Sequence, residues 1–148
     1  MLLNLTIKNW MCYRDETSFN LTSSLERQHG DTLAKLPGFR SKKALPVAAV
    51  YGGNASGKTA LFKALAVLKL MVTGDFGLSG ELPIEPFAMG EATTKTPTLF
   101  DITFLVGDTV YRYVVEVLRS GVLYESLEKL HEHRNSLVFE RIADGRTL

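Results

Sequence analysis

The sequence predicts an α/β fold in which a buried strand leads through a glycine-rich turn into a buried helix, followed by an antiparallel meander. Residues 45–51 form a continuous apolar run without alternation, which is typical of a strand covered on both faces. Apolar residues follow a helical period from 57 to 73. From 99 onward, alternating apolar and polar residues are separated by turn signals. A chain of 148 residues, 45% of them apolar, is long enough for one domain with a core.

Two strands and a loop are predicted ahead of the buried strand. Leu3, Leu5 and Ile7 alternate with polar neighbours, which is the pattern of a half-buried strand, and residues 17–22 repeat it more weakly within the N-terminal segment 1–22. Residues 23–44 are polar and charged and contain a Pro-Gly turn signal, so we expect a surface loop or insertion.

The predicted helix is apolar on nearly every side, since only Lys63 and Lys69 interrupt it. A helix of this composition is typically buried, so we expect it to lie between a sheet and other protein. Gly74 is a stop signal that ends the strand-and-helix unit 45–74. Residues 75–98 are rich in glycine and proline and predict a loop.

Residues 99–148 predict an antiparallel β-subdomain. Gly107-Asp108 is a two-residue hairpin signal between two alternating segments. Ser120-Gly121 and Arg134-Asn135 turn the chain twice more. Residues 144–148 are a further turn signal with almost no strand after them, so we expect the element begun there to be incomplete.

Composition excludes several function classes. A formal charge of +1 does not suit a strongly basic nucleic-acid clamp. The single cysteine, Cys12, excludes an internal disulfide framework and cysteine-rich zinc modules, and it suits a reducing compartment. The most apolar stretch, 64–72, is far too short to span a membrane. We therefore expect a cytoplasmic protein without a membrane partner.

Residues 52–59 fit the phosphate-binding loop pattern G-x-x-x-x-G-K-[ST]. The alternative is a glycine-rich strand-to-helix turn with an incidental lysine. The strand predicted before the motif and the helix predicted after it favour a nucleotide site. The predicted phosphate-binding residues are Gly52, Gly53, Asn54, Ala55, Ser56, Gly57, Lys58 and Thr59.

Each part of this loop has a physical role. Glycines permit positive φ and close backbone approach, so amide groups can converge on phosphate oxygens, and the following helix directs its positive end at the same anion. Lys58 is the predicted catalytic residue, because its ammonium would neutralise charge on the β- and γ-phosphates. The Thr59 hydroxyl is the predicted Mg²⁺ ligand. The GTPase signatures D-x-x-G and N-K-x-D are missing from the sequence, which argues against a GTPase.

Two segments of the sequence, one of which contains this motif, resemble segments of a known ATPase family. Residues 3–15, L-N-L-T-I-K-N-W-M-C-Y-R-D, resemble the N-terminal ϕ-x-N-F-R-S-F strand of ABC-type ATPase heads such as the SMC, RecF and OLD-like proteins. Residues 45–66 resemble more closely the AAA-family ATPases of prokaryotic anti-phage and abortive-infection loci, and both 84–87 and the meander fit that branch. The fold class implied is a P-loop NTPase of the ABC-ATPase-head type, with residues 1–148 as its N-terminal lobe.

The resemblance implies a head that binds MgATP and dimerises around two nucleotides, with a signature motif supplied by the other subunit. The implied partners are a second copy, as a head-to-head homodimer or higher oligomer, and a separate effector such as a nuclease in phage defence. Asn54 matches the Asn of the G-x-N-G-x-G-K-[ST] variant, while Ala55 replaces its following glycine. No Walker B strand, signature motif or switch histidine can be placed in these residues. We therefore expect the C-terminal half of the head to lie outside them and residues 47–51 to keep an open apolar edge.

Two departures from the family pattern support an alternative. Met11 stands where the N-F-R-S pattern has an arginine, and the only glutamine, Gln28, does not follow the helix as a Q-loop would. Both favour a non-catalytic nucleotide-sensing or scaffold subunit. A third hypothesis, a DNA-repair head of the RecF or SMC type, predicts salt-sensitive DNA binding, which the neutral composition supports little.

Overall fold

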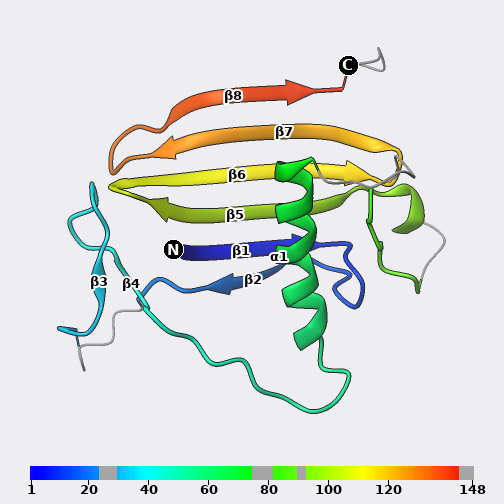
Figure 1. Cartoon of the computed structure of the whole chain (residues 1–148), viewed down its shortest axis with the longest axis horizontal. Helices are drawn as coiled ribbons and strands as arrows, with labels where there is room; N and C mark the ends of the chain where they lie inside the picture. Colours follow the sequence, from blue (N-terminus) through cyan, green and yellow to red (C-terminus); the bar gives the residue numbers. More distant parts are fainter. Residues whose placement is uncertain (24–29, 75–81, 90–92, 144–148) are drawn as a thin grey trace.

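A six-stranded antiparallel sheet with one helix packed across it forms the body of the molecule in the computed structural model, which describes residues 1–23, 30–74, 82–89 and 93–143 (Figure 1). The strand order is β2-β1-β5-β6-β7-β8. The predicted α/β class is confirmed as a helix on a sheet, with every pair of the sheet antiparallel. The elements are β1 (Leu2–Lys8), β2 (Thr17–Asn20), β3 (Ala34–Lys35), β4 (Lys43–Ala44), α1 (Lys58–Thr73), η1 (Thr93–Lys95), β5 (Thr98–Val106), β6 (Thr109–Leu118), β7 (Gly121–Leu130) and β8 (Ser136–Ile142).

The N-terminal strand β1 lies inside the sheet, between β2 and β5. Its predicted alternation is confirmed, since Leu5 and Ile7 are completely buried in the core beneath α1. Phe100 on β5 and Val115 on β6 extend the same apolar layer. The predicted meander is also confirmed, with β5 to β8 joined in sequence order by antiparallel pairing.

The helix α1 begins at Lys58 and ends at Thr73, close to the predicted limits. Gly74 caps it with a left-handed φ of 71°, and its N–H donates to the Leu70 carbonyl at 2.9 Å. The prediction that the helix is buried on all sides is wrong, because a single sheet covers only one of its faces. Phe62, on the opposite side, is 59% exposed, and Val72 in the last turn is 70% exposed. The buried residues of α1 are Ala60, Leu61, Ala64, Val67 and Leu68.

The predicted buried strand at 45–51 is wrong. This segment has no strand structure, and Val47 and Tyr51 are 80% and 91% exposed. A continuous apolar run is buried only where strands flank it and other layers cover both of its faces. Among the described residues, the sheet is built from other strands and does not include this segment. The open strand edge expected at 47–51 is absent as well, because these residues form no strand.

The predicted loop 23–44 contains a short hairpin, β3–β4, that the sequence did not indicate. Leu36 and Ala44 of this segment pack with Leu3 and Val110 in a second apolar cluster. Residues 82–89 contain neither helix nor strand, in agreement with the predicted loop, and the short η1 turn follows. Residues 24–29, 75–81, 90–92 and 144–148, including Gln28 and the final turn signal, lie outside the described residues.

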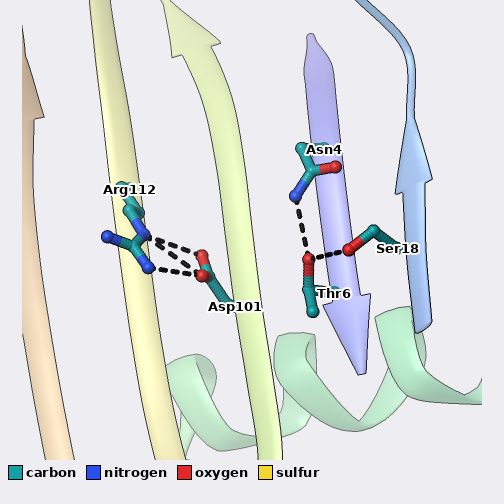
Figure 2. Close-up of polar contacts among 5 residues, drawn as sticks. All are labelled: Asn4, Thr6, Ser18, Asp101 and Arg112. Atoms are coloured by element: carbon teal, nitrogen blue, oxygen red, sulfur yellow. Dashed lines mark hydrogen bonds and ion pairs between the residues drawn. The ribbon is translucent and has the colours of Figure 1, made fainter. Parts of the chain in front are cut away.

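On the sheet face away from α1, polar side chains of β1, β2, β5 and β6 form two hydrogen-bonded groups. Arg112 on β6 forms a bidentate salt bridge with Asp101 on β5. The shortest N–O distance between the two side chains is 2.7 Å. Asn4 donates to the Thr6 hydroxyl, which in turn shares a hydrogen bond with Ser18 on β2. Figure 2 shows both groups on the opposite side of the strands from the helix.

Candidate functional site

The glycine-rich turn 52–57 connects residues 45–51, which form no strand, directly to α1. Gly57 is the residue that caps the helix N-terminus, with a φ of 91°. A Cβ at this position would lie 2.8 Å from the Tyr13 hydroxyl oxygen and 3.1 Å from the Cys12 sulfur. Glycine is therefore required at Gly57 both for its backbone conformation and for space.

The other glycines of the loop differ in what they require. A Cβ at Gly52 would lie 2.7 Å from the Ser56 hydroxyl oxygen, so the loop closes tightly on itself there. Gly53 has open space around it. The second positive φ of the loop, 61°, belongs to Ala55, the position where the resembling pattern has glycine.

The Lys58 side chain folds back over the loop that precedes it. Its ammonium donates to the carbonyl oxygens of Gly52 at 2.7 Å and Gly53 at 2.6 Å, and to the Ser56 hydroxyl at 3.2 Å. These contacts tie the two ends of the loop together around a positive charge. The first turn of α1 adds amide N–H groups without intrahelical partners and contains no acidic residue, so both features favour an anion.

A cavity of about 640 Å³ lies against this helix N-terminus. Its lining comes from residues 55–60, from Met11 and Cys12 after β1, and from residues 85–89. Thr59, the predicted Mg²⁺ ligand, is exposed in the lining. This volume is within the range of small-molecule sites. Five of the eight predicted loop residues, 55–59, line it. Gly52 and Gly53 contact Lys58 through their carbonyl oxygens, while Asn54 is exposed and absent from the lining.

Two aromatic residues that sequence reasoning missed hold the loop and helix in place. Trp10, which is buried, donates its indole N–H to the Ala60 carbonyl at 2.8 Å. Tyr13 donates its hydroxyl to the Gly57 carbonyl at 3.1 Å, and burial together with the nearby Cys12 raises the pKa of this phenol. The only local signal was a pair of aromatic residues whose polar ends can form hydrogen bonds when buried.

Met11 occupies the place that the resemblance assigns to an arginine. Its side chain lines the cavity, so the position faces the candidate site as that pattern implies, but it carries no charge. Its backbone N–H donates to the Glu85 carbonyl at 2.8 Å, and its φ is 49°. Arg14 is exposed and is absent from the cavity lining.

Residues 47–145 match the model of a family described as "AAA domain, putative AbiEii toxin, Type IV TA system". The chain belongs to this AAA family. The match spans the loop, α1, residues 85–89 of the cavity wall and the meander. Membership indicates a nucleotide-binding domain of the ATPase type. No curated protein matches this AAA domain.

The part of the chain that the structure describes has neither a cluster of metal-binding side chains nor a membrane-spanning helix. Those residues contain no group of three or more His, Cys, Asp or Glu side chains placed to hold a metal ion. Thr59 therefore stays a predicted ligand whose other partners would come from a nucleotide and water. No described helix is long and apolar enough to cross a membrane.

Proposed function

We propose that this AAA domain binds MgATP through residues 52–59, as the ATP-binding lobe of an ABC/SMC-like ATPase head. The observation that carries the proposal is the meeting of three features at one cavity: a loop closed around the Lys58 ammonium, the positive end of α1, and glycine positions where a side chain would clash. Together they suit the polyphosphate of a nucleotide.

The residues divide the work by chemistry. Amide groups of the loop and of the first helical turn donate to phosphate oxygens, and Lys58 neutralises the charge that develops on them. The Thr59 hydroxyl holds Mg²⁺, which when bound supplies further positive charge to the phosphates. Ser56 is the most weakly held of the Lys58 partners, at 3.2 Å, so it is the contact that a phosphate oxygen replaces at least cost.

Hydrolysis, in this proposal, occurs when two heads dimerise around the nucleotide and complete each other's site. The AAA domain then regulates a separate effector, in a cytoplasmic anti-phage system. The family description, which names a toxin and a toxin–antitoxin system, supports an effector of this kind.

The proposal is tested by titrating the protein with a fluorescent ATP analogue in the presence of Mg²⁺. Lys58→Ala should weaken binding at least about tenfold, because it removes the ammonium from the phosphate site. Lys69→Ala is the matched control, an exposed lysine farther along the same helix. Unchanged affinity in Lys58→Ala would refute the phosphate-binding role.

The Mg²⁺ role of Thr59 is tested in the same titration. Thr59→Ala should weaken binding when Mg²⁺ is present and have little effect in EDTA, because the hydroxyl acts through the metal. An equal loss in both conditions would contradict this role.

A second candidate, a nucleotide sensor without hydrolysis, is favoured by Met11, whose uncharged side chain lines the cavity where an arginine is the family pattern. Turnover separates the two. A sensor changes its assembly state with ATP but releases phosphate no faster than the Lys58→Ala variant does.

A further inference from the structure

The cavity has a second wall that the loop motif does not explain. We call residues 82–89 the strap. Its residues 85–89 line the cavity, and Pro86, Phe87 and Met89 give this wall an apolar character. Met89 is 88% exposed, although it is a large apolar side chain. Met11 lines the same cavity from the turn after β1.

Asn9 fixes the far end of the strap. This residue is 2% exposed, and its φ of 52° is one that asparagine tolerates better than most residues. Its side-chain amide donates to the carbonyls of Thr93 and Thr96, both at 2.8 Å, and accepts the Phe87 N–H at 3.1 Å. One buried side chain therefore joins the strap to the end of β1.

Further hydrogen bonds surround this junction. The Thr98 hydroxyl donates to the Asn9 carbonyl at 2.7 Å. The Thr93 hydroxyl donates to the Phe87 carbonyl at 2.5 Å. Phe87 is thus held through both its backbone N–H and its carbonyl, which fixes the direction of the strap where it borders the cavity.

The near end of the strap is fixed as well. Ile84 is buried in the core, and its carbonyl accepts the Arg119 Nε–H at 2.9 Å. The Glu85 carbonyl accepts the Met11 N–H, which links the two apolar walls directly. The Glu85 carboxylate lies 3.8 Å from the Lys63 ammonium on α1.

We propose that the strap is the nucleoside wall of the cavity and that Asn9 is the positioning residue that sets it. This inference rests on the proposed nucleotide function. A triphosphate held at 52–59 leaves its nucleoside to occupy the rest of the same cavity, where the strap and Met11 offer apolar contact. Aromatic and thioether side chains hold a base through its flat face. The strap therefore contributes affinity for the nucleoside and none for the phosphates.

The test measures affinity for MgATP and for magnesium tripolyphosphate, which has the phosphates without the nucleoside. Met89→Ala should weaken MgATP binding about threefold to tenfold, which is the effect expected from losing one thioether contact with the face of the base. Binding of tripolyphosphate should be unchanged. Val106→Ala is the matched control, since Val106 is 60% exposed and is absent from the cavity lining.

Asn9→Asp tests the positioning role, because a carboxylate can accept the Phe87 N–H but cannot donate to Thr93 and Thr96. We expect MgATP binding to fall about tenfold or more while tripolyphosphate binding is retained. Asn4→Asp makes the same chemical change on the sheet face shown in Figure 2 and should alter neither ligand. If Asn9→Asp does not fold, Thr93→Val removes the contact to the Phe87 carbonyl without introducing a charge.

The outcomes separate the two proposals. If the wild type binds neither ligand, the nucleotide function fails and this inference fails with it. If the wild type binds both, and the strap and Asn9 variants keep its ratio of MgATP to tripolyphosphate affinity, the strap is not the nucleoside wall and the phosphate site stands. An equal loss of both ligands in Asn9→Asp or Thr93→Val would make Asn9 a purely structural residue and overturn its positioning role.

Discussion

Ala55 has a backbone conformation that its side chain disfavours. Its φ of 61° is in the left-handed region, which costs a residue with a Cβ roughly 1–2 kcal/mol. Glycine adopts this conformation freely but loses about 0.5–1 kcal/mol of chain entropy on folding. The loop therefore stores strain at the one glycine of the resembling pattern that this sequence replaces.

Ala55→Gly should raise the free energy of unfolding by up to about 1 kcal/mol, the difference between these two terms. Urea unfolding of the wild type and the variant measures it. The matched control is Ala66→Gly on the exposed side of α1, which should lower the free energy of unfolding by about 1 kcal/mol. A loss of stability in both variants would mean that Ala55 is not strained.

At the scale of elements, residues 46–51 are exposed and lie outside every helix and strand. Tyr51, at 91% exposed, lies directly before the glycine-rich loop 52–57. Backbone that is neither paired nor packed is the kind that a protease can bind in its extended form.

Chymotrypsin should therefore cut after Tyr51 faster than after tyrosines in paired strands such as Tyr113 and Tyr124. MgATP should slow this cut, because a ligand on residues 52–59 restrains the neighbouring backbone. Limited proteolysis followed by mass spectrometry measures both effects, and Tyr51→Ser should remove the early fragment. An early cut inside β6 or β7 would contradict the difference in local stability.

The elements that could be predicted from sequence are those whose pattern is local. The alternation of β1, the hairpin signal at Gly107, the helical period of α1 and the Gly74 cap all lie within one short window. The prediction of a buried strand at 45–51 was wrong because the burial of an apolar run depends on neighbouring strands and layers that the run itself does not encode. The β3–β4 hairpin was missed because strands of two residues are too short for a period.

The same division applies to the candidate site. The motif indicated Gly57 and Lys58 because its spacing is contiguous. Asn9, Trp10 and Tyr13 were missed because their partners lie between 44 and 89 residues away in sequence. No local pattern states which distant carbonyl a buried side chain will reach.

For the molecule as a whole, the outer strand β8 concentrates exposed apolar side chains. Within the described residues it pairs only with β7, so its other edge presents free backbone groups. An edge of this kind is a template for pairing with another chain. Its exposed apolar residues are Leu137, Val138, Phe139 and Ile142.

Leu137→Lys should reduce self-association of the protein in the absence of nucleotide, because lysine on an edge strand opposes edge pairing. The new ammonium would lie directly across from Glu128 on β7, so stability should change by less than about 1 kcal/mol. Sedimentation over a range of concentrations measures association. Val106→Lys adds the same charge at the β5–β6 turn and should have no such effect. Equal effects of the two variants would assign the change to net charge rather than to the edge.

The position of β1 has a consequence for the order in which the molecule folds. The strand pairs with β5, so that Leu5 faces Ile102. Asn9 and Trp10 at its end form hydrogen bonds with Phe87 and Ala60, which line the cavity. Each hairpin of the meander joins strands that only a few residues separate. Pairing β1 with β5 instead requires closing a loop that contains residues 9–97. The cavity is therefore among the last parts to form. A nucleotide that binds it should slow unfolding and leave the rate of folding almost unchanged, which refolding kinetics with and without MgATP can measure.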